Sequence, residues 1–160
     1  MKRRFNSRIG MALLVAALPM VLCGCPPEGR PLTGSGMDMF APTTMRIHPL
    51  TRVVVEKAQI EARIEFTDQM GDITKGVGVL QFNLYKDDFG RGQMVDTWRV
   101  ELESPAANKQ TWDAITRTYL CKLVLKDPGY LAPGKKYILS ASMVFPNSTH
   151  LDDDFHITVK

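Results

Sequence analysis

The stretch Ala58–Thr67, with the sequence AQIEARIEFT, alternates strictly between apolar and polar side chains. Successive side chains of a β-strand point to opposite faces of the sheet. The alternation therefore predicts a strand with one buried and one solvated face. The residues expected on its buried face are Ile60, Ala62, Ile64 and Phe66, and those expected in solvent are Gln59, Glu61, Arg63 and Glu65.

Working outward from this stretch, the chain from Met45 to Lys160 shows six more segments of β character, separated by turn-rich loops. Pro49 cannot donate a hydrogen bond to a neighbouring strand, so it predicts a bend or an edge position in the first segment. Residues 104–110 are predicted to form a loop, and no stretch shows a helical period. The predicted strands cover residues 45–55, 58–67, 77–85, 95–103, 114–125, 136–145 and 155–159.

The overall composition is that of an ordinary globular protein, with 160 residues of which 44% are hydrophobic and 23% charged. Such proportions exclude a disordered chain, a collagen and a disulfide-dense miniprotein. Many short strands with frequent turns are typical of two packed antiparallel sheets. The sequence thus predicts an all-β fold, a single seven-stranded antiparallel sandwich over residues 45–160.

One local pattern suggests the kind of sandwich. The segment Leu131–Leu139, LAPGKKYIL, resembles the signature that precedes strand F in fibronectin type III domains. This resemblance implies an immunoglobulin-like fold in which Pro133 and Gly134 form a turn and Tyr137 is a structural tyrosine corner. The chain lacks the early core tryptophan of that family and the Cys…Trp…Cys pattern of immunoglobulin domains. A transthyretin-like sandwich or another Greek-key arrangement is the alternative.

The N-terminus has the features of an export signal, predicted over residues 1–24. Four basic side chains come first, followed by an apolar run from Ile9 to Leu22 that is interrupted by Gly10 and Pro19. That run is too short and too interrupted for a typical membrane-spanning helix, which needs about 20 apolar residues. A plain secretory signal or an uncleaved anchor is the alternative interpretation.

The run ends in Leu22-Cys23-Gly24-Cys25, which resembles the lipobox of bacterial lipoproteins. The resemblance implies that Cys25 is the first mature residue and carries a lipid such as palmitate, which would attach the protein to a membrane of the cell envelope. Pro26 in place of aspartate favours the outer over the inner membrane by the same resemblance. Residues 25–44 hold four prolines and three glycines and are predicted to form a flexible linker, with a reach of about 25 Å.

Removing the predicted signal changes the charge of the protein. The full chain carries a net charge of +3, but residues 25–160 have 16 basic and 17 acidic side chains and a net charge of −1. A nucleic-acid partner is therefore not expected, because phosphate binding needs a basic surface. Of the three cysteines, only Cys121 remains as a thiol, and its apolar neighbours predict a small core residue.

The densest polar cluster is the segment His150–His156, HLDDDFH. Imidazole and carboxylate groups together bind zinc and related ions. Neighbouring side chains on one face of a strand are nearly 7 Å apart, so at most two of them would share an ion. The alternative is a solvated strand whose charges discourage edge pairing. The candidate metal ligands, which a strand would place on one face, are His150, Asp152, Asp154 and His156, with Asp87 and Asp88 as further oxygens.

Two tryptophans are candidates for a sugar-binding platform. Trp98 alternates with the inward residues of its strand and is predicted to lie in the core, whereas Trp112 stands between a loop and a strand and is the better ligand-binding candidate. No nucleophile, base and orienting group can be assembled from three scattered histidines, so an enzyme is not expected and no cofactor is assigned. The sequence favours a lipid-anchored interaction or structural domain for a protein or cell-wall partner, with a glycan- or metal-binding module as the alternative.

Overall fold

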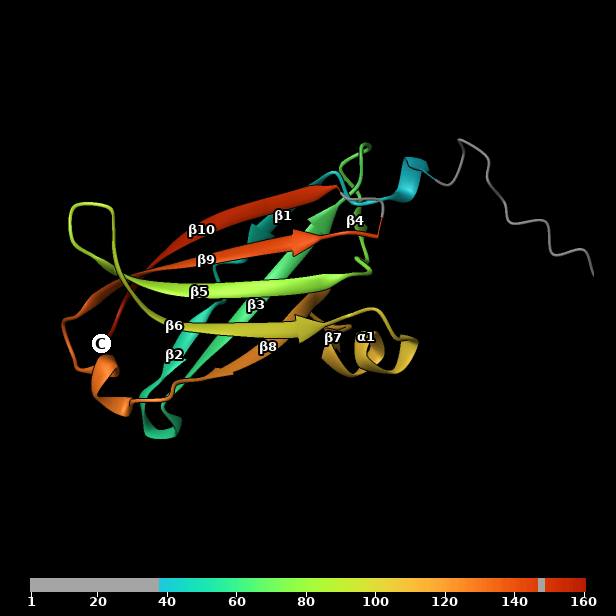
Figure 1. Cartoon of the computed structure of the whole chain (residues 1–160). Helices are drawn as coiled ribbons and strands as arrows, with labels where there is room; N and C mark the ends of the chain where they lie inside the picture. The colour runs from blue at the N-terminus through green and yellow to red at the C-terminus, as the bar shows by residue number, and fades with distance from the viewer. Residues whose placement is uncertain (1–37, 147–148) are drawn as a thin grey trace, which may run out of the picture. The chain divides into compact units, whose positions relative to one another are not determined.

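The computed structural model describes residues 38–146 and 149–160. Within them the chain forms two antiparallel sheets that pack face to face, which confirms the predicted all-β architecture (Figure 1). The predicted signal peptide, the lipidated Cys25 and most of the predicted linker lie outside the described residues. No helix in the described part of the chain is long and apolar enough to cross a membrane.

The first sheet is built around β3 (Gln59–Thr67), the strand that the alternating stretch predicted. On one side β3 pairs with β1 (Thr44–Ile47) and β2 (Arg52–Val54), and on the other with β8 (Thr118–Val124). Two short strands, β4 (Ile73–Thr74) and β7 (Trp112–Asp113), extend the sheet beside β3 and β8 respectively. β1 and β2 are separated by a turn in which the His48 carbonyl accepts a hydrogen bond from the Thr51 amide at 2.9 Å. Pro49 lies in this turn, so the chain bends where the proline predicted.

The second sheet has the strand order β10-β9-β5-β6. It consists of β5 (Val79–Asp87), β6 (Arg91–Glu101), β9 (Lys136–Val144) and β10 (His150–Thr158). β6 begins four residues earlier than predicted because the β5–β6 hairpin turns tightly through Phe89 and Gly90, both with positive φ. β10 begins five residues earlier than predicted because its polar residues pair in register with β9.

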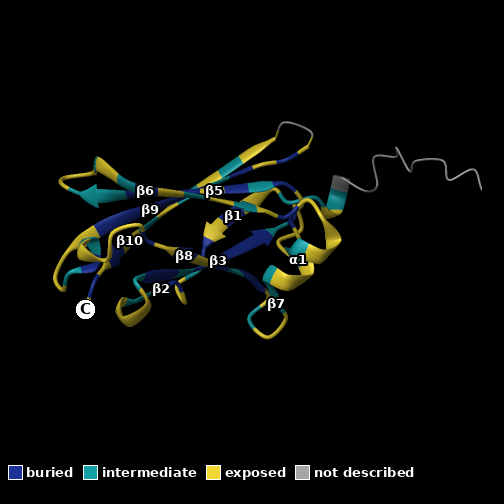
Figure 2. Cartoon of the chain, turned by 60° about the horizontal axis from the view of Figure 1, so that its bottom comes forward, coloured by how far each residue is buried: buried dark blue, intermediate teal, exposed yellow. Residues whose placement is uncertain are grey.

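The core lies between the sheets and is formed by alternate residues of the long strands (Figure 2). On β3 the four predicted apolar residues are at most 1% exposed. The opposite face of β3 is less exposed to solvent than predicted, because the side chains of Gln59 and Glu65 are also buried. Arg46 on β1 stands directly opposite Glu65 and its guanidinium lies 2.7 Å from that carboxylate. This cross-strand pair satisfies the buried charge.

Two predictions for the segment between β6 and β8 are wrong. Residues 104–110 were expected to form a loop, but Pro105–Thr111 is the helix α1. Ser104 caps it by accepting a hydrogen bond from the Ala107 amide at 3.1 Å, and proline at the first helical position costs no hydrogen bond. The predicted strand over 114–125 begins only at Thr118, because residues 114–117 form a turn in which Ile115 is 94% exposed.

Polar side chains join the two sheets at both of their sides. On one side the Ile47 amide donates to the Asp153 carboxylate at 2.7 Å, which links β1 to β10. On the other side the Trp98 indole N–H donates to the Val124 carbonyl at 2.7 Å, which links β6 to the end of β8. Trp98 was predicted to be a core residue; it is half-buried and packs against the core from this side. These contacts hold the strand edges of one sheet against the other.

Candidate ligand-binding site

Trp112 lies at one end of the sandwich, where α1 leads into β7. Its ring meets the ring of Tyr119 edge to face, with centroids 5.1 Å apart and an interplanar angle of 70°. The ammonium group of Lys75 lies 4.9 Å from the centroid of the indole ring. The indole is half-buried, so it is held firmly while part of its surface remains accessible.

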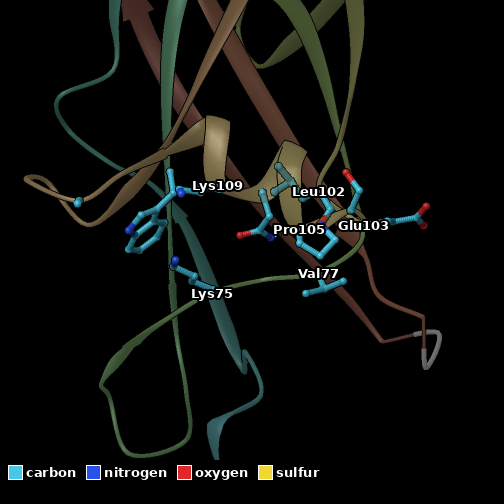
Figure 3. Close-up of a pocket in the computed structure, with 10 residues that line it drawn as sticks. Lys75, Val77, Leu102, Glu103, Pro105 and Lys109 are labelled. Atoms are coloured by element: carbon cyan, nitrogen blue, oxygen red, sulfur yellow. Dashed lines mark hydrogen bonds between the residues drawn. The ribbon is translucent and has the colours of Figure 1, made fainter.

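This tryptophan lines a cavity of about 730 Å³, which is drawn in Figure 3. A volume of this size is within the range of small-molecule sites in proteins. Val77, Leu102 and Pro105 supply apolar surface, and Lys75 and Lys109 bring positive charge. A mostly apolar hollow with a few polar groups is the usual make-up of a site that binds one face of an amphipathic ligand.

A second hollow of about 420 Å³ lies against Trp112 and includes Val100 of β6 and Lys122 of β8 in its lining. Trp112 is thus common to the linings of both hollows. None of the three histidines lines either of them. The two linings combine apolar, hydroxyl, amide, ammonium and carboxylate groups, which can bind a ligand through apolar contacts and hydrogen bonds.

The wall behind Trp112 is fixed by a hydrogen-bond network centred on Asn108 of α1. Its side-chain amide donates to the carbonyls of Gly76 at 2.7 Å and Leu102 at 3.2 Å. The Tyr119 hydroxyl donates to the Asn108 amide oxygen at 2.9 Å and to the Gly76 carbonyl at 3.1 Å. Burial raises the pKa of Tyr119 and outweighs the opposite effect of its hydrogen bonds, so the hydroxyl stays protonated as a donor.

The four candidate metal ligands of β10 share the exposed face of that strand but are not brought together as one site. His150 lies 3.6 Å from Asp152, and Asp154 accepts hydrogen bonds from the Arg91 guanidinium at 2.7 Å. His156 instead pairs with Asp87 at 3.0 Å. Among the residues that the structure describes, no group of three His, Cys, Asp or Glu side chains is placed to hold a metal ion.

The segment that resembles the fibronectin type III signature forms a tight turn and the start of β9. The Lys135 amide donates to the Ala132 carbonyl at 3.2 Å, and Gly134 has φ +80°. Pro133 and Gly134 therefore occupy the positions where a type II turn favours proline and glycine. The Tyr137 ring is buried, and its hydroxyl donates to the backbone carbonyl of Tyr130. Burial raises the pKa of this hydroxyl as well.

Cys121 lies on the buried face of β8 and is 2% exposed. Burial raises the pKa of its thiol to about 12, so the group is uncharged and unreactive at neutral pH. It therefore behaves as a small core residue.

Asp88, which was named as a further oxygen for a metal site, lies with Phe89 and Gly90 at the tip of the β5–β6 hairpin. This hairpin is on elements different from those of the Trp112 cavity.

Sequence reasoning found Trp112 but missed its neighbours Lys75, Asn108 and Lys109. The signal for α1 was present, since Ser104 followed by Pro105 is a typical helix start. It was overlooked because a helix of seven residues is too short to show an apolar period. Lys75 is 37 residues away from Trp112 along the chain, so only the fold brings the two together.

A scan of the chain against protein-family models returned no match. A search of curated proteins found no significant relative.

Proposed function

We propose that this protein is a non-enzymatic, lipid-anchored protein of the bacterial cell envelope whose β domain binds a cell-wall glycan at Trp112. The proposal extends to the fold type, an immunoglobulin-like sandwich of the fibronectin type III kind. The Tyr137 hydroxyl bonded to the upstream Tyr130 carbonyl is the contact that supports this type. The anchor rests on the lipobox resemblance at Cys25, and the outer membrane is the favoured location.

The observation that carries the glycan proposal is the position of Trp112. The indole ring of Trp112 packs against Tyr119 and lines an open cavity. It offers a flat apolar surface, on which the C–H face of a sugar ring can stack. The neighbouring ammonium, amide and hydroxyl groups of the lining can bond the sugar hydroxyls. Glu103 is the one carboxylate of this lining, whereas hydrolysis of a glycosidic bond ordinarily uses two, so the lining supports binding more than catalysis.

Sedimentation with purified peptidoglycan sacculi tests this proposal. The full-length protein in detergent is expected to co-sediment, and Trp112→Ala is expected to weaken binding by about 30-fold, because losing an aromatic anchor costs about 2 kcal/mol. The matched control is Phe89→Ala, which removes the fully exposed aromatic side chain at the tip of the β5–β6 hairpin. Circular dichroism establishes that both variants fold. Equal binding by all three proteins would contradict the proposal.

A protein partner is the second candidate function, and the β6 strand favours it. β6 has 11 residues and pairs only with β5 within the described chain, so it is an edge of its sheet. An unpaired edge can accept an extended segment of another protein as an additional strand. Crosslinking in intact cells from a photoreactive residue at Arg99 tests this candidate. Recovery of no specific protein neighbour would count against it.

A further inference from the structure

We infer that the glycan bound at Trp112 is part of an acidic polymer, and that Lys75 and Lys109 bind carboxylate groups carried next to its sugar rings. This inference rests on the function proposed above and specifies the chemical class of the ligand. It depends on two exposed ammonium groups that line one cavity, one of them directly over its aromatic ring. The following observations carry it.

Lys75 and Lys109 line the same cavity although they come from different elements. Lys75 follows β4, and Lys109 stands in the last turn of α1. Figure 3 shows the two lysines on one side of the cavity and Glu103, its one acidic residue, on the other. The two ammonium groups therefore lie away from the Glu103 carboxylate, and that of Lys75 lies over the indole ring.

Neither lysine forms a salt bridge with any residue that the structure describes. By contrast, Arg46, Arg52 and Arg63 are each paired with a carboxylate at 2.7 Å. Neither ammonium group therefore has to give up a carboxylate partner to bind an anionic ligand. Their local charge also differs in sign from the net charge of −1 on residues 25–160. An anion near the domain is therefore attracted to this cavity more than to the surface as a whole.

The contact between Lys75 and the indole ring adds a reason for selectivity. A sugar that stacks on this face of Trp112 must displace the Lys75 ammonium, which gives up its attraction to the ring. A neutral sugar offers the displaced ammonium no charged partner. A sugar with a carboxylate attached beside it offers that group, so the ammonium exchanges a cation–π contact for a charged hydrogen bond. Binding of the acidic ligand is therefore favoured over binding of its neutral counterpart.

Sacculi with native and with neutralised carboxylates test the inference. Peptidoglycan carries its free carboxylates on the peptides attached to its sugar chains, and coupling them to methylamine with a carbodiimide removes their charge while leaving the sugar rings unchanged. The full-length protein is expected to bind native sacculi about three- to tenfold more tightly than amidated sacculi, from two exposed ion pairs. The double variant Lys75→Gln/Lys109→Gln is expected to bind both preparations equally. Raising the salt concentration is expected to weaken only the binding of the wild type to native sacculi.

The matched control is Lys135→Gln/Lys136→Gln, which removes the same charge from two exposed lysines that do not line the Trp112 cavity. This control is expected to bind like the wild type. Equal binding of the wild type to native and amidated sacculi would overturn the inference and leave the glycan proposal intact. Binding to neither preparation would overturn both. Because a lipid anchor inserts into any vesicle, the vesicle arm uses the Cys25→Ser variant. Binding of this variant to phosphatidylglycerol vesicles but not to sacculi would also overturn both, because the anion would then belong to a lipid.

Discussion

At the scale of single residues, the structure is held by a few side chains that bond to distant backbone groups. Asp96 is a clear case, since its buried carboxylate accepts hydrogen bonds from its neighbour Thr97 and from the Lys126 amide, both through the backbone. Burial raises the pKa of Asp96, but the bonds from Lys126 and Thr97 outweigh it and the net pKa is lowered. Such residues connect elements that do not share a strand ladder.

Tyr137 allows a test at this scale. Tyr137→Phe removes the hydroxyl that donates to the Tyr130 carbonyl and keeps the buried ring. The free energy of unfolding, measured with urea, is expected to fall by about 1 kcal/mol. Tyr85→Phe is the control, because the Tyr85 hydroxyl makes no hydrogen bond with a described residue. Equal stability of the two variants would show that the Tyr137 bond contributes nothing.

Asp113 provides a test by pH. The hydrogen bond from Arg63, joined by that from the Ile115 amide, lowers the pKa of Asp113 to about 2 from its ordinary 3.8. A carboxylate with a lowered pKa stabilises the fold above its unfolded pKa and loses this effect as the pH falls through the folded pKa. Asp113→Asn is therefore expected to be less stable than the wild type at pH 6, and the difference is expected to shrink between about pH 4 and 2.

Urea unfolding of both proteins at pH 6 and at pH 2.5 measures this difference. A stability difference that stays constant over the two pH values would show that the ionised form of Asp113 plays no part. Asp72→Asn serves as the control, because its carboxylate is exposed and makes no hydrogen bond or salt bridge with a described residue.

At the scale of elements, the connection from β4 to β5 positions one side of the Trp112 cavity. Gly78 lies in this connection with φ +157°, and a Cβ atom added to it would meet the Val144 carbonyl oxygen at 2.4 Å. The Gly78 carbonyl also accepts a hydrogen bond from the Leu102 amide at 2.8 Å. Close approach of backbone to backbone at this point requires glycine.

Gly78→Ala is expected to destabilise the protein by about 2 kcal/mol or more, since the clash is with backbone that a rotamer change cannot relieve. Gly71→Ala is the matched comparison, with φ +84° and open space around the added Cβ. It is expected to cost about 1 kcal/mol, from the left-handed backbone alone. Thermal or urea unfolding compares the two. If Gly71→Ala were less stable than Gly78→Ala, the steric argument would be contradicted.

At the scale of the whole molecule, the chain enters the β domain at the end where α1 and Trp112 lie (Figure 1). The Thr74 hydroxyl donates to the Phe40 carbonyl at 2.9 Å, which fastens the entering chain next to Lys75. The proposed lipid anchor would therefore tether the domain by the end that holds the cavity. The β5–β6 hairpin lies at the opposite end (Figures 1 and 2).

The anchor is tested by Cys25→Ser. In cells fed a palmitate analogue, the wild type is expected to be labelled and to fractionate with the envelope membranes. The variant is expected to lose both the label and the membrane association, because a serine hydroxyl does not replace the thiol that receives the lipid. Cys121→Ser is the matched control and is expected to keep the label. Label retained by the Cys25 variant would refute the anchor.

The sequence by itself determined the strands β3, β5 and β9, the face of each that contributes to the core and the turn at Pro133-Gly134. These follow from local chemistry, namely the period of two along a strand and the backbone preferences of proline and glycine. Short elements escaped this reasoning, since seven residues of α1 carry no period. Only the tertiary structure decided that Lys75, Asn108 and Trp112 meet in one cavity, while the four polar residues of β10 take separate partners. The physical reason is that strand pairing and sheet packing join residues far apart in the chain, and no local pattern records which of them will meet.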